Sequence, residues 1–161
     1  MKQEELARFL STLSGTPDRI WQLTQGLDRK ALTWKPSDGA FSVLENVCHL
    51  RDIEAEGYLV RIERLLREDR PTLSDLDGNK LAREREYNSQ NLTAALDAFR
   101  TARVRSLTLL KGARPISWQR EGHWDGVGRI TLEGLLLKMI EHDRGHLDEI
   151  NQLVDRLAER M

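Results

Sequence analysis

The stretch Met139–Ile150, MIEHDRGHLDEI, places His142 and His146 four residues apart in a segment of helical periodicity. Side chains four apart lie one turn apart on the same face of an α-helix, so both imidazoles can approach one cation. Apolar residues spaced by threes and fours continue the same stripe on both sides: Leu132, Leu135, Met139, Ile150, Leu153 and Leu157. Because such a stripe faces the core, we expect both histidines in the protein interior. A buried imidazole without a partner costs about 1–3 kcal/mol, which a bound metal ion would offset.

His49 is the third candidate ligand. It lies in CHLRDIEAE, on a second predicted helix, near the apolar face that includes Ile53. Catalytic metal sites usually present three protein ligands and leave a position for water or substrate. The predicted metal ligands are therefore His49, His142 and His146. The alternative is that each interior histidine is satisfied by a neighbouring carboxylate or carbonyl, because a pair of histidines at this spacing is common by chance.

Four long helices account for most of the chain. The first is expected from Lys2 to Gly26, with a kink or break at Pro17 in SGTPDR. The second begins near Val43, after Ser42 and Glu45 at capping-box spacing, and continues through Leu66 for about six turns.

The third helix has Asn88, Ser89 or Asn91 as its candidate cap and Gly112 just past its end. Its predicted apolar positions are Leu92, Leu96, Phe99, Val104, Leu107 and Leu110. The following segment 113–130, ARPISWQREGHWDGVGRI, is too rich in Pro, Gly and Trp for regular structure, and Thr131 caps the last helix. With runs of alternating β-branched residues missing, the predicted fold is an all-α four-helix bundle.

Composition excludes several classes of function. At 161 residues the chain is expected to form a single domain, 1–161. Lys and Arg number 25 against 26 Asp and Glu, a net charge of −1, so a nucleic-acid partner is not expected. No apolar run reaches membrane-spanning length, and MKQEELARFL lacks the apolar core of a signal peptide. Together with Cys48 as the sole cysteine, this predicts a cytoplasmic protein without a membrane partner.

Two segments together resemble the DinB-like superfamily of damage-inducible proteins: FSVLENVCHLRDIE (41–54) and GRITLEGLLLKMIEHDRGHLDEI (128–150). Where such proteins often have Trp-Ser, this chain has Phe41-Ser42. The resemblance covers nearly the whole chain. It implies an up-down-down-up bundle with His49, His142 and His146 on a divalent metal, commonly nickel or zinc. It also implies a thiol-dependent S-transferase acting with a low-molecular-weight thiol on an electrophilic substrate, and a homodimer.

Other residues are candidate neighbours of the metal. Asp52 and Glu56 share the face of His49 and are candidates to orient it, whereas His123 and Trp124 in the irregular segment are candidates to line the pocket. The sequence does not single out a catalytic residue. Arg120, Arg129 and Arg144 are candidates to meet an anionic substrate, Cys48 is expected to be a small buried hydrophobe, and Trp21 is expected in the core.

Two further functions stay open beside thiol transfer. One is a metal-dependent hydrolase, because a cation that activates a thiol can also activate water. The other is a non-catalytic stress-response or interaction module with a structural or vestigial metal site. An enzyme predicts a pocket that reaches the metal and is walled by the loops LTWKPSDG (32–39) and SWQREGHWDG (117–126), whereas the interaction module predicts that these loops seal the site.

Overall fold

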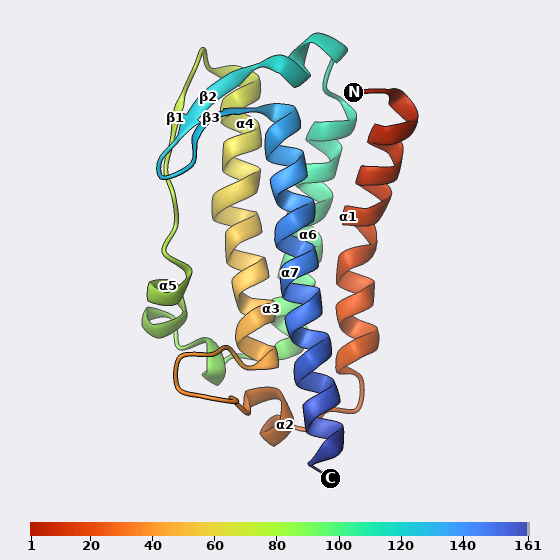
Figure 1. The fold of residues 1–161 in the computed structure, drawn as a ribbon, viewed down its shortest axis with the longest axis vertical. Helices are drawn as coiled ribbons and strands as arrows, with labels where there is room; N and C mark the ends of the chain where they lie inside the picture. Colours follow the sequence, from red (N-terminus) through yellow and green to blue (C-terminus); the bar gives the residue numbers. More distant parts are fainter. Residues whose placement is uncertain (161) are drawn as a thin grey trace.

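Four helical rods lie side by side in the structure, a computed structural model that describes residues 1–160 (Figure 1). The rods are α1 (Gln3–Thr24), the continuous α3 (Val43–Asp52), π-helical turn (Ile53–Tyr58) and α4 (Leu59–Arg67), α6 (Leu92–Lys111), and α7 (Leu132–Glu159). α1 and α7 run in one direction and the other two rods run in the opposite direction. This confirms the expected four-helix bundle and its up-down-down-up order.

Short elements join the rods. They are α2 (Arg29–Thr33), β1 (Thr72–Leu73), α5 (Gly78–Glu84), two 3₁₀ turns (Tyr87–Ser89 and Pro115–Gln119), β2 (Glu121–Trp124) and β3 (Gly128–Thr131). The strands form a small sheet in the order β1-β2-β3, with β1 parallel and β3 antiparallel to β2. The prediction that segment 113–130 is irregular was therefore wrong. Its glycines supply the positive φ angles of the hairpin turn at Gly126 and Gly128.

Helix starts follow the predicted caps. Ser42 and Glu45 form a complete capping box, and the side chains of Asn91 and Thr131 accept the backbone N–H of the third helical residue in α6 and α7. These contacts depend on residues three apart in sequence, which is why the local pattern was sufficient to predict them.

The predicted break in the first helix is absent, because α1 continues through Pro17. A proline inside a helix removes the hydrogen bond to the carbonyl four residues earlier, here that of Leu13. The Arg103 guanidinium of α6 donates to that carbonyl at 2.8 Å. A contact from another helix thus satisfies the acceptor that Pro17 leaves free.

The face of α6 was also predicted incorrectly at one position. Val104 is 61% exposed, and the adjacent Arg103 lies in the interior instead, 2% exposed. Trp21, expected in the core, is 53% exposed on α1. Cys48 is fully buried, as predicted, and burial raises the pKa of its thiol to about 11.

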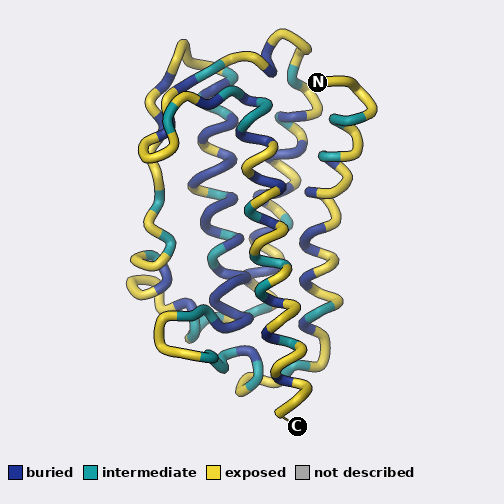
Figure 2. The backbone as a smooth tube through the Cα atoms, viewed as in Figure 1, coloured by how far each residue is buried: buried dark blue, intermediate teal, exposed yellow. Residues whose placement is uncertain are grey.

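The buried residues lie along the inner faces of the four rods (Figure 2). The apolar residues among them form two clusters. Along α7, the buried apolar residues between Leu132 and Ile140 belong to one cluster, and those between Ile150 and Leu157 belong to the other. The segment between them carries both histidines of the opening motif. Within residues 1–160, none of the helices has an apolar stretch sufficient to cross a membrane.

Candidate metal centre

Three imidazoles meet between the two apolar clusters. His49 comes from α3, and His142 and His146 come from α7. One ring nitrogen of each lies within 4.8 Å of the others, and the ring centroids are 4.5–5.1 Å apart. Two helices distant in sequence therefore bring together the three residues that the sequence singled out.

The spacing of the nitrogens fits a single divalent ion. Nε2 of His49 and Nε2 of His142 are 3.1 Å apart. Two nitrogens that each bind one ion at about 2.1 Å lie about 3.0–3.4 Å apart, from right-angled to tetrahedral coordination. The same distance also allows a hydrogen bond in which one Nε2 carries the proton. The geometry alone is compatible with both arrangements, and the cluster is one that could hold a metal.

The histidines are held in the form that binds metals. Burial, reinforced by the nearby His146, lowers the pKa of His49 to about 4. Burial and the other two imidazoles lower the pKa of His142 to about 2, and burial also lowers the pKa of His146. All three rings are therefore neutral at pH 7, and each has a lone pair available for a cation.

The π-helical turn Ile53–Tyr58 positions an aromatic ring against this cluster. In an uninterrupted α-helix at about 100° per residue, Tyr58 would point to the side opposite His49, nine residues before it. The wider turn absorbs an extra residue and rotates the following chain. As a result, the Tyr58 ring packs 5.6 Å from that of His142. The apolar spacing of this segment predicts a regular helix, because nothing in the spacing marks the π-helical turn.

Gly78, at the start of α5, packs directly on His49. A Cβ added to Gly78 would lie 2.6 Å from Cε1 and 2.8 Å from Nδ1 of the ring, which is closer than atoms can approach. The same His49 Nδ1 is buried and finds no hydrogen-bond partner among residues 1–160. A glycine is required at this position for α5 to close over the imidazole.

An open cavity of about 350 Å³ reaches two of the three imidazoles. Its lining residues are Gly39, Ala40, Phe41, His49, Gly78, Asn79, His146 and Glu149. The end of the loop 32–39 thus contributes to the wall, as expected. The loop 117–126 does not line this cavity, because it packs at the opposite end of the bundle with Trp118 and Trp124 buried. The start of α5 forms the wall in its place.

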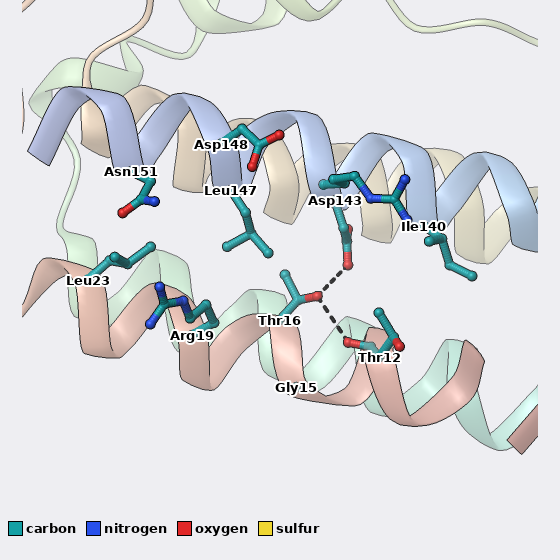
Figure 3. A pocket seen from close by; sticks show the side chains of 11 residues that line it. Thr12, Gly15, Thr16, Arg19, Leu23, Ile140, Asp143, Leu147, Asp148 and Asn151 are labelled. Atoms are coloured by element: carbon teal, nitrogen blue, oxygen red, sulfur yellow. Dashed lines mark hydrogen bonds between the residues drawn. The ribbon is translucent and has the colours of Figure 1, made fainter. Parts of the chain in front are cut away.

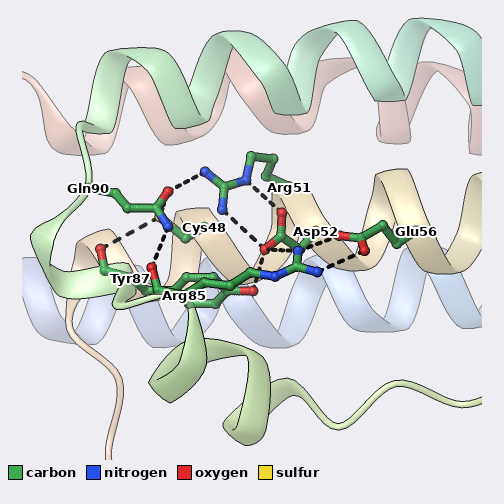
Figure 4. A network of polar contacts seen from close by, with 7 residues as sticks. All are labelled: Cys48, Arg51, Asp52, Glu56, Arg85, Tyr87 and Gln90. Atoms are coloured by element: carbon green, nitrogen blue, oxygen red, sulfur yellow. Dashed lines mark hydrogen bonds and ion pairs between the residues drawn. The ribbon is translucent and has the colours of Figure 1, made fainter.

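Asp52 and Glu56, predicted as neighbours of His49, lie in a separate network (Figure 4). The Asp52 carboxylate accepts hydrogen bonds from Arg51 at 2.8 Å, Arg85 at 3.0 Å and the Tyr87 hydroxyl at 2.6 Å. Glu56 also pairs with Arg85, at 2.9 Å. These contacts attach the segment between α5 and α6 to α3 and to the π-helical turn. Both carboxylates are bound by these partners.

His123 and Trp124 occupy opposite faces of β2. His123 is exposed to solvent. Trp124 is buried and packs edge-on against Tyr58, with 6.1 Å between the ring centroids. It therefore supports the ring that contacts His142 without lining the cavity.

The three arginines proposed for anion binding also lie away from the cavity. Arg120 donates to the carbonyls of Leu65 and Glu68. Arg129 pairs with Glu121 across the hairpin. Arg144 lines a different groove, of about 380 Å³, between α1 and α7.

A buried ion network that was not predicted from the sequence lies beside His142. Arg103 pairs with Glu54 of the π-helical turn and with Asp143 of α7. Thr16 of α1 donates to Asp143 at 2.6 Å, at the floor of the α1–α7 groove (Figure 3). The signal that could have revealed it is the spacing Phe99, Arg103, Leu107, which places an arginine in the apolar stripe of α6.

Known proteins share this architecture. The structure of YfiT from Bacillus subtilis, described as "a probable metal-dependent hydrolase with an unusual four-helix bundle topology", superimposes with a TM-score of 0.90 over 98% of this chain and 90% of YfiT, at 21% identity. A Halalkalibacterium halodurans protein named "Putative metal-dependent hydrolase" is 22% identical over 97% of this chain and 90% of its own length. A Geobacillus thermodenitrificans protein of the same name is 24% identical over 74% of this chain and 66% of its own length.

The family itself is settled by sequence. The sequence profile of the DinB superfamily matches residues 12–150, a range that includes all three histidines of the cluster. The chain belongs to the DinB superfamily.

Proposed function

We propose that this protein is a divalent-metal-dependent enzyme, with hydrolysis as the leading reaction class. The observation that carries the proposal is the cavity, which opens onto His49 and His146. An interaction module with a sealed metal site would have these rings covered by the loops. The names of the Halalkalibacterium and Geobacillus relatives support a metal-dependent hydrolase.

His49, His142 and His146 are the residues that would hold the ion. A divalent cation at this point lowers the pKa of a coordinated water or thiol and polarises a substrate carbonyl. An all-imidazole set suits zinc or nickel, the two metals that we propose.

Glu149 is the residue we assign to proton transfer. It is the sole carboxylate among the described residues that line the cavity. Burial raises its pKa, partly offset by a hydrogen bond from Asn46, which moves the group toward the range in which a general base works best. In this role Glu149 accepts the proton from the attacking nucleophile and returns it to the leaving group.

The walls of the cavity indicate the substrate class. Of the described residues that form them, none is a lysine or an arginine, and the aromatic ring of Phe41 faces the same space. A small molecule that is neutral, with an apolar part to pack on Phe41, fits this wall better than an anionic molecule. The amide of Asn79 offers both a donor and an acceptor for its polar groups.

Thiol transfer is the second candidate. The open cavity admits a small thiol as readily as water, and a cation at the three imidazoles would favour the thiolate. An electrophilic small molecule would then be the second substrate. The predicted homodimer, the stress-response role and the cytoplasmic location stay predictions.

Metal analysis tests the proposal first. Protein purified without a histidine tag is compared by elemental analysis with His142→Ala and with His123→Ala, which removes an exposed histidine outside the cluster. We expect about one zinc or nickel per chain in the wild type and in His123→Ala, and loss of metal in His142→Ala. Equal metal content in all three would refute the assignment.

Activity assays then separate the reaction classes. Loaded protein is incubated with neutral esters and amides, and in parallel with low-molecular-weight thiols and electrophiles. Hydrolysis that depends on the metal supports the leading class, and thiol conjugation supports the second. Inactivity across both panels, with metal bound, would favour the interaction module.

A further inference from the structure

A buried asparagine on α3 contacts the histidine cluster. Asn46 is fully buried, and its Oδ1 lies 2.7 Å from Nδ1 of His146. It is located three residues before His49 on the same helix. One turn of α3 thus provides a candidate ligand and also touches a second candidate ligand on α7.

The orientation of the Asn46 amide is determined by its other contacts. Its Nδ2 donates to the backbone carbonyl of Ser42 at 3.0 Å. A backbone carbonyl can only accept, so the amide group that faces it must be the Nδ2 donor. Oδ1 is therefore the atom that faces His146.

An acceptor at this position decides which nitrogen of His146 carries the proton. Oδ1 cannot donate, so Nδ1 of His146 must carry the hydrogen of the 2.7 Å contact. Glu149 is farther from the same nitrogen, at 3.7 Å, beyond hydrogen-bond distance. Nε2 is then the nitrogen that retains a lone pair, and it can join those of His49 and His142.

We propose that Asn46 is a positioning residue for the metal centre. By accepting the Nδ1–H of His146, it selects the tautomer and the ring orientation that make Nε2 a ligand. The inference rests on the proposed function for its purpose, because a fixed tautomer serves a metal site. The tautomer itself is a property of the metal-free protein and can be measured without any metal.

The test combines a spectroscopic measurement with metal affinity. Histidine nitrogens are observed by ¹H–¹⁵N correlation NMR of metal-free protein at pH 7.5, with His146→Gln used to assign the signal. We expect the Nδ1–H tautomer for His146 in the wild type. Asn46→Leu is expected to shift His146 toward Nε2–H and to weaken zinc binding about 10- to 100-fold in a chelator competition.

Two further variants keep the test decisive. Asn46→Asp keeps an acceptor for Nδ1–H but loses the donor to the Ser42 carbonyl, so a folded Asn46→Asp is expected to retain the tautomer, even if Asn46→Leu fails to fold. Asn151→Ala is the control, because Asn151 is an exposed asparagine of α7 that lines the α1–α7 groove, and it is expected to behave as wild type.

The outcomes separate this inference from the proposed function. A wild-type His146 that carries its proton on Nε2 would overturn the role of Asn46 directly. A folded Asn46→Leu with the wild-type tautomer, or a folded Asn46→Asp that loses it, would also overturn that role. If the tautomer follows Asn46 as expected but no chain binds zinc, the positioning contact stands and the metal-dependent function fails.

Discussion

Arg103 binds both carboxylate oxygens of Asp143, with Nη1 to Oδ2 at 2.7 Å and Nη2 to Oδ1 at 2.9 Å. The same guanidinium binds Glu54 in the π-helical turn and the Leu13 carbonyl in α1. Asp143 directly follows His142 in the chain. One arginine on α6 therefore connects the other three rods at the level of the histidine cluster.

Removing this arginine is expected to destabilise the fold strongly. Arg103→Met leaves two buried carboxylates without their partner, a change that typically costs about 3–5 kcal/mol. The measurement is the free energy of unfolding in urea, monitored by circular dichroism. The matched control is Arg105→Met, two residues away, where the side chain is exposed and pairs loosely with Glu63 at 3.7 Å. A similar loss of unfolding free energy in both variants would show that the buried network stabilises the fold no more than the exposed ion pair does.

A methyl group at Gly78 is expected to disturb the metal centre more than the fold. The Cβ of Gly78→Ala would collide with the His49 ring, so either the ring or α5 must move. We expect zinc affinity to fall at least about tenfold, since ligand orientation sets metal affinity. Gly39→Ala is the control, because it lies on the same cavity wall and its added Cβ meets nothing within 4 Å. Unchanged zinc affinity in Gly78→Ala would show that α5 moves to accommodate the added methyl group and leaves the His49 ring in place.

The metal-free protein is expected to lose stability as the pH falls from 7.5 to 5.5. The pKa of His49 in the folded protein is about 4 and that of His142 about 2, whereas in the unfolded chain both are near 6.5. Between these values the unfolded chain binds more protons, so the free energy of unfolding rises with pH. Each histidine accounts for about 1.4 kcal/mol of the loss at pH 5.5.

The measurement for this prediction is urea unfolding at several pH values in the presence of a chelator. The double variant His49→Gln/His142→Gln should show a flatter dependence over the same range. A wild-type protein whose stability does not change between pH 7.5 and 5.5 would contradict the prediction.

Glu149→Gln tests the proton-transfer role. An amide cannot accept the proton, so kcat is expected to fall about 10²- to 10⁴-fold, with the zinc content unchanged. The limb of the pH–rate profile that reports this carboxylate should disappear as well. Asp148→Asn is the control, because the neighbouring Asp148 is exposed and lines the α1–α7 groove instead of the cavity. Full activity in Glu149→Gln would show that a group other than Glu149 acts as the general base.

The sequence by itself determined the features that depend on residues within one or two turns of each other. The spacing of His142 and His146 places both rings on the core-facing stripe of α7 because a helix repeats every 3.6 residues. The caps at Ser42, Asn91 and Thr131 follow from the same local geometry. The choice of His49 as the third member of the cluster relied on the apolar face of its helix.

Only the tertiary structure decided the features that depend on contacts between rods. Pro17 stays inside α1 because Arg103, 86 positions later in the printed sequence, satisfies the Leu13 carbonyl. The interior position of Arg103 in place of Val104 depends on carboxylates that α7 and the π-helical turn provide. Asn46 faces His146 from a different helix, across 100 residues of sequence. A local pattern cannot identify such partners, because the burial of a polar group becomes favourable only when its partner from another helix is in place.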